Sequence, residues 1–297
     1  MIPWRPLSFG LNGSALYFAR YMFLRLLPMP LVRHGVGRCI AFFATLTGGK
    51  REAPLASPAV NEVVNRIKSS GFSALPPVLT ASQAAEVRAF LAEQPAYDGK
   101  REFFVTSGPC DALRASYPVA TILKCPHLLR AINSPEALSI AEAYLGCKPT
   151  IAALGLNWSF PQPGREADVQ QFHRDSEAWR LLNMFIYLTD VDDEAGPHRY
   201  VLGSHRTMGR VRLTPYSESQ VNDRFGKSST HNILGPEGTT FIEDGWGIHE
   251  ANPPISKRRL ILAVMYSLGP IPIYDYERVK VAETHDYDKY VNRLLFA

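Results

Sequence analysis

The sequence predicts a mainly β protein with flanking helices, and three observations support this prediction. The 297 residues include 23 prolines and 21 glycines, so the chain turns often, which suits short strands better than a long helical bundle. From Thr150 onward, short apolar segments are separated by turn residues, a pattern typical of an antiparallel sandwich or barrel. Helical patterns are concentrated before this point. We therefore expect helices to support a β-rich second half.

Residues 1–56 are expected to form a basic, apolar helical arm and a linker. Helical patterns cover residues 15–27 and, more weakly, 31–46. The stretch 48–58 is rich in glycine and proline and predicts the linker.

Residues 57–297 are expected to form the main domain, with helical support over 57–149. Thr80 and Gln83 have the spacing of a capping box. Ser134 precedes a proline at a first helical position. The helices predicted in this part cover about 59–68, 81–93 and 135–145, and a short strand is predicted after Gly71.

The β core is expected over 150–270, followed by a C-terminal tail over 271–297. The tail is predicted to be helical over 283–296. The predicted core strands lie in the apolar segments 151–160, 185–191, 238–244 and 259–268.

The distribution of charge argues against a role in binding nucleic acid. The chain has a net charge of +4, but residues 1–51 hold seven basic residues and no acidic one. Residues 52–297 therefore carry a net charge of −3, which is unlike a nucleic-acid-binding surface. The four cysteines are far apart and include no Cys-x-x-Cys pair. These features favour a cytoplasmic protein in a reducing compartment.

The N-terminal arm combines its basic residues with eight aromatic ones, a mixture that suits the surface of an anionic membrane. We therefore expect a peripheral membrane contact through residues 1–51. The alternative is that the arm packs on the main domain or on a second subunit. The sequence does not indicate the oligomeric state.

His173 and Asp175 are the first candidates for chemistry. On a strand, residues two apart project to the same face, so this imidazole and carboxylate could bind one metal ion. A His-x-Asp triplet is weak evidence alone, since a histidine and an aspartate beside a turn would give the same pattern.

His249 follows a predicted apolar strand and could complete the site. Two histidines and one carboxylate form the facial triad of non-haem iron, which leaves three positions open on the ion. Taken alone, His249 could equally be a packing histidine.

Arg258 and Arg259 precede the last core strand, where a guanidinium could bind a carboxylate with two hydrogen bonds. Because side chains alternate along a strand, Arg259 shares a face with Ile261 and Ala263. Arg258 shares the opposite face of the strand with bulkier residues such as Leu260 and Leu262, and that face suits packing in the core. We therefore assign Arg259 to the site.

The order of these motifs resembles the phytanoyl-CoA dioxygenase family. The resemblance covers about residues 60–270. Gly196-Pro197 and the later Gly203-Ser204-His205-Arg206 are similar to the family's GPL…PGSHR stretch, with Leu202 in place of the usual proline. The motifs in order are His173-x-Asp175, then FIYLTDVDDEAGPHRYVLGSHR, then GTTFIEDGWGIHEA, then the basic strand.

The resemblance implies a double-stranded β-helix, also called a jelly-roll or cupin-like fold, and an iron(II)- and 2-oxoglutarate-dependent enzyme. Iron(II) would bind to His173, Asp175 and His249, and Arg259 would bind the far carboxylate of 2-oxoglutarate. Reaction with O2 would hydroxylate a small or lipid-like molecule and release succinate and CO2. Several family members have a serine two residues after the second histidine, where this chain has Ala251. Asn157 could supply a replacement contact or be structural.

Two other readings use the same residues. The triad could hold zinc in a hydrolase, or the fold could be a non-catalytic jelly-roll binding module. Arg259 argues against the hydrolase, and the complete ligand set argues against the binding module. The sequence does not identify the substrate.

Overall fold

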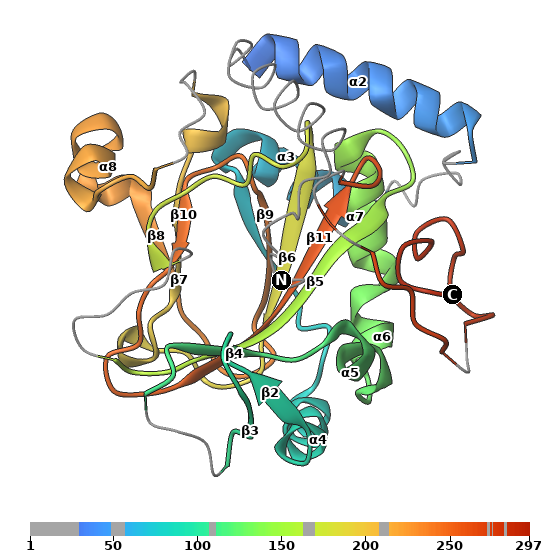
Figure 1. Ribbon diagram of the computed structural model, residues 1–297. Helices are drawn as coiled ribbons and strands as arrows, with labels where there is room; N and C mark the ends of the chain where they lie inside the picture. The colour runs from blue at the N-terminus through green and yellow to red at the C-terminus, as the bar shows by residue number, and fades with distance from the viewer. Residues whose placement is uncertain are drawn as a thin grey trace, which may run out of the picture.

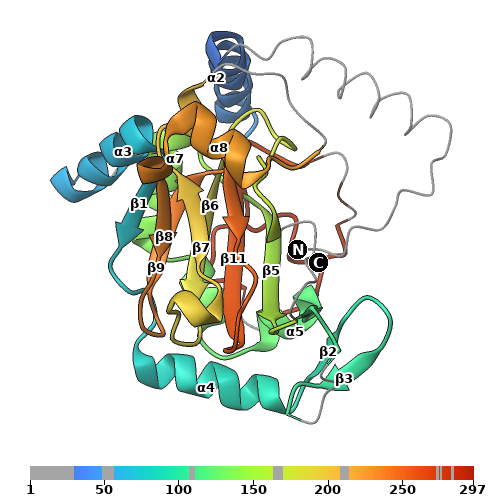
Figure 2. The same cartoon turned by 90° about the vertical axis from the view of Figure 1, so that its left-hand side faces the viewer.

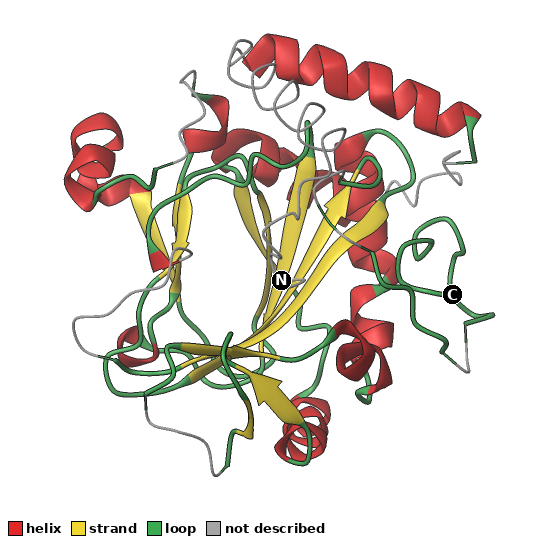
Figure 3. Ribbon diagram, in the orientation of Figure 1, coloured by secondary structure: helices red, strands yellow, loops and turns green. Residues whose placement is uncertain are grey.

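A computed structural model describes residues 30–48, 57–106, 111–162, 170–207, 214–271, 274, 276–281 and 284–297. Two antiparallel sheets face each other, and helices cover the outer side of the larger sheet (Figure 1). Colouring by secondary structure makes the layers visible, with strands in the middle and helices around them (Figure 3). This arrangement confirms the predicted mainly β fold with flanking helices.

The larger sheet has eight strands in the order β1-β9-β6-β11-β5-β4-β2-β3, and the smaller sheet has three in the order β10-β7-β8. The strands of the larger sheet are β1 (Phe72–Leu75), β2 (Pro95–Tyr97), β3 (Glu102–Phe104), β4 (Arg114–Ser116), β5 (Thr150–Ser159), β6 (Leu181–Tyr187), β9 (Thr240–Asp244) and β11 (Arg259–Ser267). Those of the smaller sheet are β7 (His198–Val201), β8 (Thr230–Ile233) and β10 (His249–Ala251).

The helices lie mainly in the first half of the chain, as predicted. They are α2 (Pro30–Leu46), α3 (Pro58–Ser70), α4 (Ala81–Ala92), α5 (Val119–Lys124), α6 (Leu128–Ile132), α7 (Pro135–Leu145) and α8 (Glu218–Phe225), with short 3-10 helices at Asp193–Ala195, Ser204–Arg206 and Lys227–Ser229. Figure 2 shows α4 beneath the sheets and α2 at the opposite end.

Local sequence signals explain several helix ends. Thr80 and Gln83 form the predicted reciprocal capping box at the start of α4. Ser134 caps α7, and Gly146 ends it with φ of 89°, a left-handed conformation that favours glycine.

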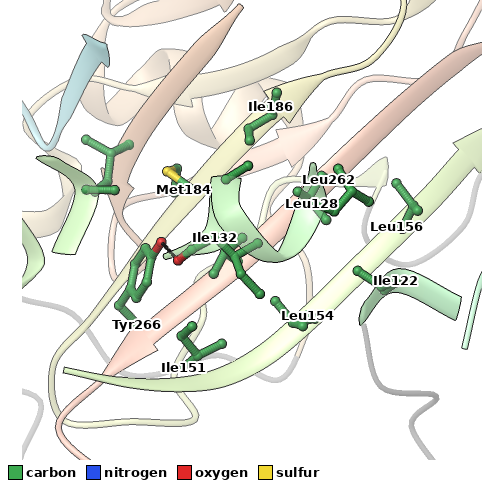
Figure 4. Close-up of a cluster of buried hydrophobic side chains, with 14 of the residues drawn as sticks. Ile122, Leu128, Ile132, Ile151, Leu154, Leu156, Met184, Ile186, Leu262 and Tyr266 are labelled. Atoms are coloured by element: carbon green, nitrogen blue, oxygen red, sulfur yellow. Dashed lines mark hydrogen bonds between the residues drawn. The ribbon is translucent and has the colours of Figure 1, made fainter. Parts of the chain in front are cut away.

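Strand register separates a packing face from a site face. In the pairing of β11 with β5, Arg259 lies opposite Ser159 and Ile261 opposite Asn157. These residues face the smaller sheet. The alternate residues of β11 pack against α5 and α6, where the Tyr266 hydroxyl donates to the carbonyl of Ile132 at 2.7 Å (Figure 4). The same alternation along β6 puts Met184 and Ile186 in this apolar cluster.

Several expectations were wrong. The described part of 283–296 forms turns instead of a helix. The Asp288 carboxylate accepts from the backbone N–H groups of Tyr290 and Val291, and the Val291 carbonyl accepts from Ile151 at 3.0 Å. These bonds hold the tail against β5 and replace a regular helical ladder.

The β-rich half is also less regular than expected. It contains the helix α8, although no helical pattern was expected between its strands. His173 and Asp175 lie in an extended segment with isolated bridges and not in a strand of either sheet. The short strand predicted after Gly71 is present as β1, but residues 57–149 also supply β2, β3 and β4, which were not expected.

The arm is described only in part. The helix predicted over 31–46 is present as α2, whereas the one predicted over 15–27 lies outside the described residues. Within the part of the chain that the structure describes, no helix is both long and apolar enough to cross a membrane.

Candidate metal centre

The structure brings His173, Asp175 and His249 together between the two sheets. His173 and His249 are joined by a pair of backbone hydrogen bonds of 2.9 and 3.0 Å, and the Asp175 N–H donates to the carbonyl of Gly245 at 2.8 Å. The segment 173–175 is therefore held directly alongside the chain that leads into β10. His249 lies on β10 in the smaller sheet, so it does not continue the apolar strand that precedes it.

The three side chains have the spacing of a metal site. Nε2 of His173 is 3.6 Å from Oδ1 of Asp175, and Nε2 of His249 is 3.6 Å from Oδ2 of the same carboxylate. One ligand atom from each residue lies within 4.8 Å of the other two. His249 is buried, while His173 and Asp175 are half-buried, so one side of the site is accessible.

Backbone contacts orient both imidazoles. Nδ1 of His173 lies 2.8 Å from the carbonyl of Gln171, and Nδ1 of His249 lies 3.0 Å from the carbonyl of Gly247. A carbonyl only accepts, so each Nδ1 carries the proton and each Nε2 presents a lone pair. Two such nitrogens and one carboxylate fit iron(II) as a facial donor set.

Asp175 is held by a residue that the sequence reasoning missed. Nδ2 of Asn183 on β6 donates to Oδ2 of Asp175 at 2.5 Å. A Cβ on Gly245 would lie 3.2 Å from Cβ of Asp175 and 2.2 Å from Leu181, so glycine is needed for this close approach. A lone asparagine in the apolar run LLNMFIY was the available sequence signal.

Glu243 is a second residue that was missed. It is fully buried on β9, and its Oε2 lies 2.9 Å from Nε2 of His198. Burial raises the pKa of Glu243 to about 8 and lowers that of His198 to about 3, because desolvation disfavours the charged forms. Burial likewise lowers the pKa of His249. Period-two alternation from Phe241 would have placed Glu243 on the site face.

His198 and His205 lie outside the group of three candidate ligands. Both are buried, and Nε2 of His205 lies 3.2 Å from the carbonyl of Lys68. Burial lowers the pKa of His205.

Arg259 is buried on the site face, with 1% of its surface exposed. Its Nη2 lies 3.5 Å from the Ser159 hydroxyl, while Nε and Nη1 have no hydrogen-bond partner among the residues that the structure describes. A buried guanidinium with free donors is costly unless a ligand satisfies it. Burial lowers the pKa of Arg259. Arg258 is exposed, with its guanidinium 5.1 Å from the centre of the Trp158 ring.

Asn157 is buried on the same face of the sheet as Arg259, opposite Ile261. Its Oδ1 accepts from the Ser116 hydroxyl at 2.8 Å. This contact gives Asn157 a structural partner, and its role towards a co-substrate stays a prediction. Ala251 lies on β10 opposite His198.

Comparisons with known proteins agree with this fold. The family model described as phytanoyl-CoA dioxygenase matches residues 67–260. A structure of EctD from S. alaskensis with 2-oxoglutarate and 5-hydroxyectoine has a TM-score of 0.56 and 21% identity, covering 74% of this chain and 79% of that one. EctD from S. alaskensis with bound Fe gives 0.55 and 20%, covering 73% and 80%. Among curated proteins, none matches the sequence.

Proposed function

Because the chain belongs to the phytanoyl-CoA dioxygenase family and is a 2-oxoglutarate-dependent dioxygenase, we propose that it hydroxylates a small molecule, with His173, Asp175 and His249 as the iron(II) ligands. 2-Oxoglutarate is the co-substrate, and succinate and CO2 are released. The observation that carries this proposal is the spacing of the three ligand atoms, within 4.8 Å of one another between the sheets.

The residues of the site have separate roles in this proposal. Bound iron(II) with 2-oxoglutarate and O2 supplies the oxidation of a substrate C–H bond. Arg259 binds the far carboxylate of 2-oxoglutarate, for which its unpartnered Nε and Nη1 are available donors. Asn183 holds the Asp175 carboxylate towards the ion. Burial of His249 and Arg259 keeps water from the co-substrate.

The metal distinguishes this proposal from a zinc hydrolase with the same triad. Apoenzyme is loaded with iron(II) or zinc(II) and incubated with 2-oxoglutarate, ascorbate and O2, and succinate is measured. We expect succinate only with iron(II), formed slowly in the absence of substrate. Equal inactivity with both metals, together with zinc-dependent hydrolysis of model esters, would contradict the proposal.

We also propose that the enzyme contacts an anionic membrane surface through the outward side of α2. Of the eight large hydrophobic side chains exposed among the described residues, four lie on this helix: Leu31, Phe42, Phe43 and Leu46. Residues 1–51 contain no acidic residue, so no negative charge within them opposes anionic lipid. Each basic residue near such a surface gains about 1 kcal/mol.

Sedimentation with vesicles tests this contact. Protein is mixed with phosphatidylcholine vesicles containing phosphatidylserine, at low and high salt. We expect Phe42→Asp/Phe43→Asp to lose binding at low salt, whereas Ile255→Asp, which changes an equally exposed apolar residue outside α2, binds as wild type does. Wild-type protein that ignores the vesicles at low salt would contradict the proposal.

A further inference from the structure

Two residues of the larger sheet each lie next to a different one of the proposed metal ligands. Asn183 on β6 and Glu243 on β9 are directly opposite in register, so their side chains share the site face. Asn183 donates to Asp175. Oε1 of Glu243 lies 3.5 Å from Nδ1 of His249, the nitrogen that faces away from the metal position.

The Glu243 carboxyl group is held from the other sheet. Its Oε2 is 2.9 Å from Nε2 of His198 on β7, so the pair links the two sheets across the interior. Within the described part of the chain, Oε1, the oxygen nearer His249, has no hydrogen-bond partner. A fully buried carboxyl group with an unsatisfied oxygen is unfavourable for stability, which indicates a role beyond packing.

His198 is itself tightly placed. Its ring centre lies 4.6 Å from that of Phe185 and 5.4 Å from that of Phe241. It also lies 5.5 Å from the His249 ring, at an interplanar angle of 25°. The ring face of His198 therefore packs against the proposed ligand His249. Its Nε2 contacts the carboxyl group of Glu243, which lies next to that ligand.

We infer that Glu243 and His198 are positioning residues for the metal ligand His249. Glu243 lies beside the Nδ1 proton, which the Gly247 carbonyl accepts. An oxygen acceptor there favours the tautomer with a free lone pair on Nε2 and makes that nitrogen a stronger donor to a metal. His198 fixes the rotation of the carboxyl group and of the imidazole. This inference rests on the metal site proposed above.

Binding of cobalt(II), used as a spectroscopic substitute for iron(II), tests the inference without turnover. Absorption titrations compare wild type, Glu243→Gln and His198→Leu, and the control Glu237→Gln changes a carboxylate that pairs with Arg88 away from the site. We expect each of the two site variants to weaken cobalt binding by about 10- to 100-fold, the usual effect of removing a partner of a ligating histidine. The control should bind cobalt as wild type does.

Two further readouts separate positioning from general damage. Circular dichroism and the unfolding midpoint show whether each variant is folded. The KM for 2-oxoglutarate at saturating iron should stay within about twofold of wild type, since Arg259 is unchanged. If Glu243→Gln does not fold, the cobalt affinity of His198→Leu alone tests the positioning role.

The outcomes distinguish this inference from the proposed function. A folded Glu243→Gln or His198→Leu protein with wild-type cobalt affinity and spectrum overturns the positioning role, while wild type and Asp175→Ala still differ. If wild type binds cobalt no better than Asp175→Ala, the metal site itself is wrong, and the inference fails with it.

Discussion

Arg258 and Arg259 are neighbours in sequence with opposite environments. Arg259 is buried on the site face with unpartnered donors, and Arg258 is exposed beside Trp158. Arg259→Leu should raise the KM for 2-oxoglutarate, because losing a desolvated charge-assisted pair costs roughly 2–5 kcal/mol. This corresponds to about 30-fold or more. Arg258→Leu should leave the KM within about threefold of wild type.

Steady-state succinate assays at varied 2-oxoglutarate measure both variants. If Arg258→Leu is the damaging change, the assignment of Arg259 as the anchor is wrong by one residue.

At the residue scale, the sequence predicts those parts of the site that follow from periodicity. Alternation along a strand was enough to place Arg259 on the face of Ile261. The same rule did not reveal Asn183 or Glu243, because single polar residues in apolar strands have many possible partners. Their importance depends on which strands become neighbours, and β6 pairs with β9 across more than 50 residues of chain.

At the scale of elements, a buried charge helps to attach α2 to the main domain, beside the apolar contact of Ala41 with the core. Arg33 donates to the carbonyl of His205 at 3.2 Å, and its guanidinium lies 4.4 Å from the centre of the Trp246 ring. Although burial alone would raise the pKa of Asp244, Arg33 and other nearby groups hold it below its usual value. The inner side of α2 thus meets the segment that leads to His249.

Arg33→Ala should therefore lower the free energy of unfolding by about 2 kcal/mol, the range for a hydrogen bond from a charged donor. Arg38→Ala, which changes an exposed arginine on the same helix, should change it by less than about 0.5 kcal/mol. Chemical denaturation compares the two variants. Equal effects would show that Arg33 does not anchor the helix.

Elements with complete local signals were predicted well. The capping box of α4 and the proline start of α7 lie close to their predicted positions. The tail over 283–296 was mispredicted because its apolar spacing suits a helix, whereas Asp288 and the contact with β5 decide its backbone. A local sequence pattern does not reveal such a hydrogen bond between residues that are distant in the chain.

For the whole molecule, the composition and the strand pattern predicted a mainly β fold, and the resemblance supplied the jelly roll. Neither gave the strand order, which joins β1 to β9 and β11 to β5 over long separations. The proposed division between an arm over 1–56 and a domain over 57–297 stays a prediction. Arg33 ties α2 to the domain despite the intervening residues.

The whole site depends on the meeting of the two sheets, since His249 comes from the smaller sheet and Asn183 and Arg259 from the larger. The central claim is that this meeting point holds catalytic iron through Asp175. The most direct test is succinate formation from 2-oxoglutarate by iron(II)-loaded wild type and Asp175→Ala, with circular dichroism confirming that both are folded. We predict that Asp175→Ala forms no succinate above the enzyme-free background, and full turnover by this variant would contradict the account.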